Sequence, residues 1–120
     1  MTEAKTLNTK YTRPWGYYIN LAEGEGFLTK LIHVNPDGKL SVQSHNHRSE
    51  HWYILKGQAS VLIDQKEYTL NIGDSVDIPL KAVHTIHNPF KESLELIEIQ
   101  TGDFLSEDDI IRYSDIYGRV

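Results

Sequence analysis

Hydrophobic and polar residues alternate in short runs, and turn-forming residues interrupt these runs about every ten positions along the chain. The runs are rich in β-branched and aromatic residues. Short runs of this kind, separated by Gly, Pro, Asn and Asp, are typical of β-sandwiches and β-barrels. The pattern predicts strands over residues 16–20, 27–34, 40–47, 51–56, 58–63, 67–70, 75–78, 83–87 and 94–100.

Some of these runs also indicate local detail. Both faces of the run 60–63 carry apolar residues, as in a strand that is covered on two sides. Glu95 and Glu98 interrupt the apolar run 94–100, which indicates that this strand is partly exposed. Pro36-Asp37-Gly38 predicts a turn in which the proline presets its own φ and the glycine adopts a positive φ.

The end of the chain has a different pattern, and we predict a short C-terminal helix there. Ser106 is a candidate N-cap, and the acidic residues 107–109 that follow it favour the positive end of a helix dipole. Ile110 and Ile111 give such a helix apolar side chains to bury. Residues 1–12 lack a strong pattern and form an N-terminal arm, which leaves one all-β domain over residues 13–120.

Composition and charge exclude several classes of function. A length of 120 residues fits one domain, and the net charge of −5 argues against binding nucleic acid through its phosphates. The absence of cysteine excludes disulfides, thiolate metal ligands and cysteine nucleophiles. No apolar run is long enough to span a membrane, and the first residues do not resemble a signal peptide, so we expect a cytoplasmic protein.

Histidines are unevenly distributed along the chain, and this distribution points to a metal site. Three of the six histidines, His45, His47 and His51, lie within seven residues. On a strand, residues at i, i+2 and i+4 share a face, so Gln43, His45 and His47 would project together. Imidazoles near a carboxylate are suitable ligands for a first-row metal ion. A further ligand must come from elsewhere in the chain, either from His84 or from His87.

Two segments resemble the two sequence motifs of the cupin superfamily. The segment from Gly38 to Gly57 contains the H-x-H pair and Glu50, which is followed by six residues and Gly57. The second segment resembles the second cupin motif in the spacing of its residues Gly73, Pro79, His84 and Asn88. Lys81 stands where cupins usually carry a glycine. The resemblance implies a double-stranded β-helix, or jelly-roll barrel, with a metal ion inside it.

Three further blocks resemble one family of cupins more closely. They are RPWGxY at residues 13–18, LSVQxHxHRxEHW at 40–52 and EDDIIR…DxYGR at 107–119. Together they are similar to the cupin domain of type II mannose-6-phosphate isomerases, which often follows a mannose-1-phosphate guanylyltransferase domain. The resemblance implies a stand-alone isomerase of mannose 6-phosphate and fructose 6-phosphate in polysaccharide precursor metabolism, without guanylyltransferase activity.

The metal ligands are predicted in alternative sets. One set is His45, His47, Glu50 and His84, although Glu50 then follows His47 by one residue fewer than the common cupin spacing. A second set replaces His47 with Gln43, which restores that spacing and resembles the Gln-x-His element of type I mannose-6-phosphate isomerases. A third set uses His51, which lies on the strand face opposite Glu50 unless a bulge intervenes. Zinc is the first expectation for the metal, and manganese, iron, cobalt and nickel also suit such ligands.

Catalysis requires a base, and the substrate phosphate requires positive charge. The candidate bases are His47, His51 and His87, and the candidate substrate-binding residues are Arg48, Arg112, Tyr117 and Arg119. We expect a homodimer because a small barrel of this kind often covers its sheet edges by pairing. The alternative functions are a non-catalytic cupin that binds a sugar or nucleotide sugar, and a cupin enzyme of another chemistry, such as an epimerase or a dioxygenase.

Overall fold

The computed structural model describes residues 6–118 and consists of strands joined by turns and loops. The strands are β1 (Lys10–Arg13), β2 (Gly16–Gly24), β3 (Phe27–Val34), β4 (Val42–Ser44), β5 (Arg48–Lys56), β6 (Ala59–Ile63), β7 (Lys66–Leu70), β8 (Ser75–Ile78), β9 (His84–His87), β10 (Leu94–Gly102) and β11 (Ile111–Ser114). The described part of the chain contains no helix that is long and apolar enough to cross a membrane.

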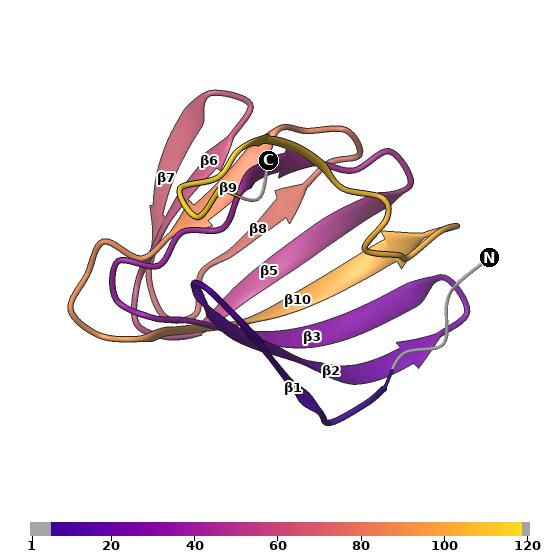
Figure 1. Ribbon diagram of the computed structural model, residues 1–120, viewed down its shortest axis with the longest axis horizontal. Coiled ribbons are helices and arrows are strands. Elements are labelled where there is room, and N and C mark those ends of the chain that lie inside the picture. The colour runs from indigo at the N-terminus through magenta and orange to yellow at the C-terminus, as the bar shows by residue number, and fades with distance from the viewer. Residues whose placement is uncertain (1–5, 119–120) are drawn as a thin grey trace.

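The strands form two antiparallel sheets that face each other (Figure 1). One sheet has the order β1-β2-β3-β10-β5-β8, and the other has the order β11-β4-β9-β6-β7. Because β10 lies between β3 and β5, strands that are far apart in the sequence become neighbours. The all-β prediction is confirmed, and most predicted strands are present with shifted ends.

Side chains alternate between buried and more exposed positions along the strands, and the buried ones form the interior. In β3, burial alternates residue by residue, and the same alternation holds along most of β5 and β10. The inward-facing apolar residues of both sheets pack into one core. Its buried members are Trp15, Tyr18, Ile32, Val34, Trp52, Ile54, Ala59, Val61, Leu70, Ile78, Ala82, Ile86, Leu94 and Leu96. Residues 10–12, which the sequence pattern left in the N-terminal arm, pair with β2 as part of β1.

The predicted C-terminal helix is wrong, because β11 pairs with β4 instead. The local capping signal is nevertheless present, since Asp108 N donates to Ser106 Oγ at 3.1 Å. Asp109, however, turns its carboxylate to the 45–47 segment and accepts hydrogen bonds from Asn46 N and His47 N, both at 2.9 Å. These long-range contacts and the pairing with β4 replace a helical continuation.

Two turns show how individual residues fix the backbone. In the Pro36-Asp37-Gly38 turn, the positive φ of 66° belongs to Asp37 and not, as expected, to Gly38. Gly38 is needed for another reason, because a Cβ there would lie 2.7 Å from Trp15 O. At the position where cupins usually carry glycine, Lys81 adopts a φ of 67°, which is the left-handed region that glycine favours. The turn therefore keeps the glycine-like conformation with a lysine in it.

Candidate metal centre

Three side chains from three segments meet inside the barrel. His45 follows β4, Glu50 is the third residue of β5, and His84 begins β9. Their exposed fractions are 2%, 4% and 3%, and their candidate ligand atoms all lie within 4.8 Å of one another. Glu50 Oε2 lies 3.1 Å from His45 Nε2, and Glu50 Oε1 lies 3.9 Å from His84 Nε2. The structure thus brings together the three ligands that the predicted sets with Gln43 and with His47 have in common.

Backbone carbonyls hold both imidazoles in the orientation that a metal ligand needs. His45 Nδ1 lies 2.7 Å from Asp109 O, and His84 Nδ1 lies 2.9 Å from Ala82 O. A carbonyl oxygen only accepts hydrogen bonds, so each Nδ1 carries the proton. The lone pair of a neutral ring is then on Nε2, which faces Glu50 in both cases. A proton and a cation would therefore compete for the same position beside Glu50.

Electrostatics keeps Glu50 ionised and His84 neutral. Burial alone would raise the pKa of the Glu50 carboxyl. Hydrogen bonds with His45 and Glu98 and the charge of Arg48 outweigh burial and hold that pKa well below its usual range. Burial lowers the pKa of His84, and the charge of Glu50 offsets this only in part. A carboxylate and a neutral imidazole are the protonation states that bind metal ions, so Glu50 and His84, with the Nε2 of His45 facing the same position, fit a divalent first-row cation.

The residues around Glu50 fix its position. Arg48 Nε donates to Glu50 Oε2 at 2.9 Å, and Trp52 Nε1 donates to Glu50 Oε1 at 3.0 Å. Trp52 Nε1 also lies 3.1 Å from Glu98 Oε1, so the indole bridges the two carboxyl groups. Burial and the neighbouring Glu50 raise the pKa of Glu98 to about 8. Glu98, which the sequence pattern assigned to a partly exposed strand, is therefore a buried interior carboxyl with an exposed fraction of 6%.

The other predicted ligands lie outside this cluster or beside it. Gln43 pairs with His84 in the β4–β9 register and lines a small cavity together with Glu50 and His84. Its Nε2 donates to Ser41 Oγ at 2.8 Å. The side chain of His47 is 51% exposed and lies 3.4 Å from Asp103. The expected strand 40–47 ends at Ser44, so His45 and His47 do not share a strand face.

The other candidate bases are also turned away from Glu50. His51 is on the opposite face of β5 from Glu50, and its Nδ1 lies 2.6 Å from Asp77 Oδ1. His87 follows His84 by three positions in β9, and because an odd offset reverses the face of a strand, the two side chains point to opposite faces.

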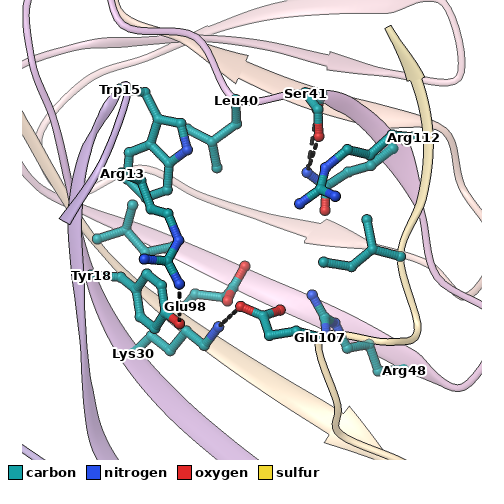
Figure 2. A pocket seen from close by; sticks show the side chains of 13 residues that line it. Arg13, Trp15, Tyr18, Lys30, Leu40, Ser41, Arg48, Glu98, Glu107 and Arg112 are labelled. Carbon is teal, nitrogen blue, oxygen red and sulfur yellow. Dashed lines mark hydrogen bonds and ion pairs between the residues drawn. The ribbon is translucent and has the colours of Figure 1, made fainter. Parts of the chain in front are cut away.

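A pocket of about 80 Å³ lies beside the cluster (Figure 2). Arg48 and Arg112, two of the predicted substrate-binding residues, line it, and so do four charged residues that were not among the predicted site residues, Arg13, Lys30, Glu98 and Glu107. Lys30 and Glu98 were missed because alternation within a strand does not distinguish a polar interior from solvent. The one local signal for Lys30 and Glu98 is that each charged residue stands two positions from an apolar residue on the same face of its strand. Arg13 was missed because only the sheet topology brings β1 to the pocket.

Among the described residues, Tyr117 is a predicted substrate-binding residue that does not line the pocket. Tyr117 packs against the core, and its hydroxyl accepts a hydrogen bond from Lys39 N at 3.2 Å. Arg119 lies outside the described residues.

Comparisons with known proteins identify the family to which this chain belongs. Residues 2–115 match the family model described as mannose-6-phosphate isomerase C-terminal. The mannose-1-phosphate guanylyltransferase of Escherichia coli (strain K12) is 46% identical over 108 residues, which is 90% of this chain and 23% of that protein. The alginate biosynthesis protein AlgA of Pseudomonas aeruginosa is 47% identical over 107 residues, which is 89% of this chain and 22% of that protein. The chain therefore spans less than a quarter of the length of these two relatives.

A solved structure shows the same fold. The sugar phosphate isomerase of the cupin superfamily from Silicibacter pomeroyi superposes with a TM-score of 0.63 and 18% identity, over 71% of this chain and 58% of that one. At this identity the likeness concerns the fold alone, which is the double-stranded β-helix expected from the motifs. The chain thus has a cupin fold and belongs to the mannose-6-phosphate isomerase C-terminal family.

Proposed function

We propose that this domain is a metal-dependent sugar-phosphate isomerase that interconverts mannose 6-phosphate and fructose 6-phosphate. The observation that carries the proposal is the position of the His45, Glu50 and His84 cluster next to a pocket lined by cationic side chains. Glu98 connects the two, because it lines the pocket and lies beside Glu50. Family membership and the names of the relatives, which include alginate biosynthesis, support a role in sugar-phosphate metabolism.

Within this proposal, His45, Glu50 and His84 hold one divalent cation, and Gln43 is its fourth ligand from the chain. When bound, the cation supplies Lewis acidity that stabilises negative charge on the sugar oxygens. Arg48 keeps Glu50 oriented toward the site through the 2.9 Å hydrogen bond. Zinc suits two imidazoles with a carboxylate, and manganese, iron, cobalt and nickel are to be tested beside it.

The reaction moves a proton between two neighbouring carbons of the sugar, so a group in the pocket must accept it and return it. The candidate bases that the sequence suggests, His47, His51 and His87, do not line this pocket. Among the described residues, the carboxyl groups that do line it are Glu98 and Glu107. We therefore assign the proton transfer to one of these two carboxyl groups. Loss of turnover without loss of substrate binding in Glu98→Gln or in Glu107→Gln identifies which one.

The proposal is tested by turnover and metal content together. The purified protein is stripped with a chelator, reloaded with each candidate metal, and assayed for conversion of mannose 6-phosphate to fructose 6-phosphate. We expect His84→Ala to lose stoichiometric metal and activity, because it removes a ligand from the cluster. His87→Ala is the matched control on the other face of β9, and we expect it to keep both.

Other outcomes contradict the proposal in distinct ways. Binding of mannose 6-phosphate without turnover would favour a sugar-binding cupin without isomerase activity. Consumption of oxygen by the iron-loaded protein would indicate a dioxygenase. Stoichiometric metal in His84→Ala would contradict the assigned metal centre.

A further inference from the structure

The pocket beside the metal centre carries an excess of positive charge. Its charged lining residues are the cations Arg13, Lys30, Arg48 and Arg112 and the carboxyl groups Glu98 and Glu107. The chain as a whole has a net charge of −5, so this local excess is opposite in sign to the rest of the molecule. Such a concentration of cations at a pocket indicates an anionic ligand.

Two of the cations already have carboxylate partners. Arg48 is buried and donates from Nε to Glu50, while its Nη1 lies 3.4 Å from Ser106 O. The buried ammonium group of Lys30 lies 3.5 Å from Glu107 Oε1, and Glu107 itself is about half exposed. A buried ammonium group needs an anion beside it, and here a carboxylate from the segment after β10 supplies one.

The other two cations have no such partner. Arg13 donates to Thr12 O at 2.9 Å and to the hydroxyl of Tyr18 at 3.3 Å, and its guanidinium carbon lies 5.2 Å from the Tyr18 ring centroid. These partners fix the side chain without neutralising its charge. The backbone of Arg112 pairs with Gln43 of β4, but within residues 6–118 its guanidinium group has neither a hydrogen bond nor an ion pair. Within the same residues, Arg13 has no carboxylate within ion-pair distance.

These two arginines come from different sheets and face the same cavity. Arg13 ends β1 at the edge of the six-stranded sheet, and Arg112 lies in β11 at the edge of the five-stranded sheet. Figure 2 shows them on opposite walls of the pocket, with Lys30 and Glu107 between Arg13 and Arg48. A planar guanidinium group binds phosphate oxygens through two parallel hydrogen bonds, and two such groups on facing walls suit one phosphate.

We propose that Arg13 and Arg112 form the phosphate subsite of this pocket and that Glu107 is an internal anion that the phosphate displaces from Lys30. The identification of the ligand as a sugar phosphate rests on the proposed function, whereas the anion subsite rests on the charges and contacts alone. In the unliganded protein Glu107 neutralises Lys30. An entering phosphate repels this carboxylate and takes its place, so Glu107 lowers the affinity for phosphate.

Calorimetric titration of the full chain with inorganic phosphate tests this assignment. We expect Arg13→Gln and Arg112→Gln each to weaken phosphate binding by about tenfold, since each removes charge-assisted hydrogen bonds. We expect Glu107→Gln to strengthen binding several-fold. Misfolding would not produce such a gain. Lys66→Gln, which removes an exposed cation of β7 outside the pocket lining, is the matched control and should bind like the wild type.

The results separate this inference from the proposed function. Unchanged phosphate affinity in both arginine variants, or weaker binding in Glu107→Gln, would overturn the subsite. If turnover of mannose 6-phosphate is present but KM is unchanged in Arg13→Gln and Arg112→Gln, the subsite is wrong and the isomerase assignment stands. If phosphate binds as expected but no turnover is found, the isomerase assignment is wrong and the subsite stands.

Discussion

The two ends of the barrel interior are built by the same strands but differ in what they bury. At one end, Leu96 of β10 pairs with Ile54 of β5, and both side chains are fully buried among other apolar groups. At the other end, Gln100 pairs with Glu50, and Arg48, Glu98 and the two histidines of the candidate metal centre are buried nearby. Glu98 and Gln100 keep the inward-facing parity of Leu94 and Leu96 along β10, so the two ends differ in the chemistry of the side chains that this parity turns inward.

The apolar end stabilises the fold, whereas the polar end carries the candidate functional residues and lowers the stability of the fold. Burial of a Leu side chain contributes about 2 kcal/mol through the hydrophobic effect. Burial of a charged group costs free energy unless partners compensate it, and a buried ion pair is weak evidence for stability. A concentration of charges such as that of Arg48, Glu50 and Glu98 is therefore best explained by function. Stability and chemistry can therefore be tested separately on neighbouring residues of one strand.

The largest effect on stability is expected at the apolar end. Leu96→Ala removes a fully buried side chain, and we expect it to lower the free energy of unfolding by about 2–5 kcal/mol, through lost burial and the cavity left behind. Metal content at saturation should be unchanged, because Leu96 is not among the residues around the cluster. Urea denaturation and elemental analysis measure the two quantities. Ile99→Ala, on the outer face of the same strand and 37% exposed, is the matched control and should cost about 1 kcal/mol or less.

At the polar end, Glu98→Gln should change how stability depends on pH in the metal-stripped protein. The folded state raises the pKa of Glu98 to about 8, above the 4.5 of a free side chain, so the folded state retains a proton that the unfolded chain loses. The contribution of Glu98 to stability is therefore complete below pH 4.5 and is lost as the pH rises toward 8. His84, whose pKa is lowered, has the opposite dependence, but it is present in both proteins and cancels in their difference.

We thus expect Glu98→Gln to gain stability relative to the wild type progressively between about pH 5 and pH 8. Gln retains an amide that can donate to Glu50, so the packing is preserved. The measurement is the difference in the free energy of unfolding at several pH values. A difference that is constant over this range would show that Glu98 is ionised in the folded protein and that the assigned protonation state is wrong.

The sequence predicts the apolar end of the barrel better than the polar end. Turn residues and β-branched runs locate most strands, because these signals are local. His45, Glu50 and His84 are also identified as candidate ligands, since the spacing within the two motifs marks them. His47 is different, because its orientation depends on the hydrogen bonds that Asp109 accepts from residues 46 and 47, more than sixty positions away.

The residues that line the pocket illustrate the same limit. Glu98 was assigned to a partly exposed strand because a polar residue within an apolar run suggests solvent when the neighbouring strands are unknown. Arg13 lines the pocket because β1 pairs with β2 at the edge of the six-stranded sheet, which is a feature of the tertiary fold and not of the local sequence. The C-terminal helix was predicted from a capping signal that does form at Ser106. Tertiary contacts of Asp109 and β11 then override the local preference, as they commonly do for short segments.

The smallest expected effect concerns the backbone that supports the polar end. Lys81 N donates to His45 O at 2.9 Å, so the turn between β8 and β9 helps to position a metal ligand. Lys81 has a φ of 67°, a conformation that is unfavourable for a residue with a Cβ.

Lys81→Gly relieves this strain but also increases the entropy of the unfolded chain, so the net gain in stability over the wild type should be below about 1 kcal/mol. Lys81→Ala retains the strain and removes the side chain, so Lys81→Gly should be more stable than Lys81→Ala by about 1 kcal/mol in urea denaturation. If Lys81→Gly is instead the less stable of the two, the positive φ is not a source of strain, and the polar end bears only the cost of its buried charges.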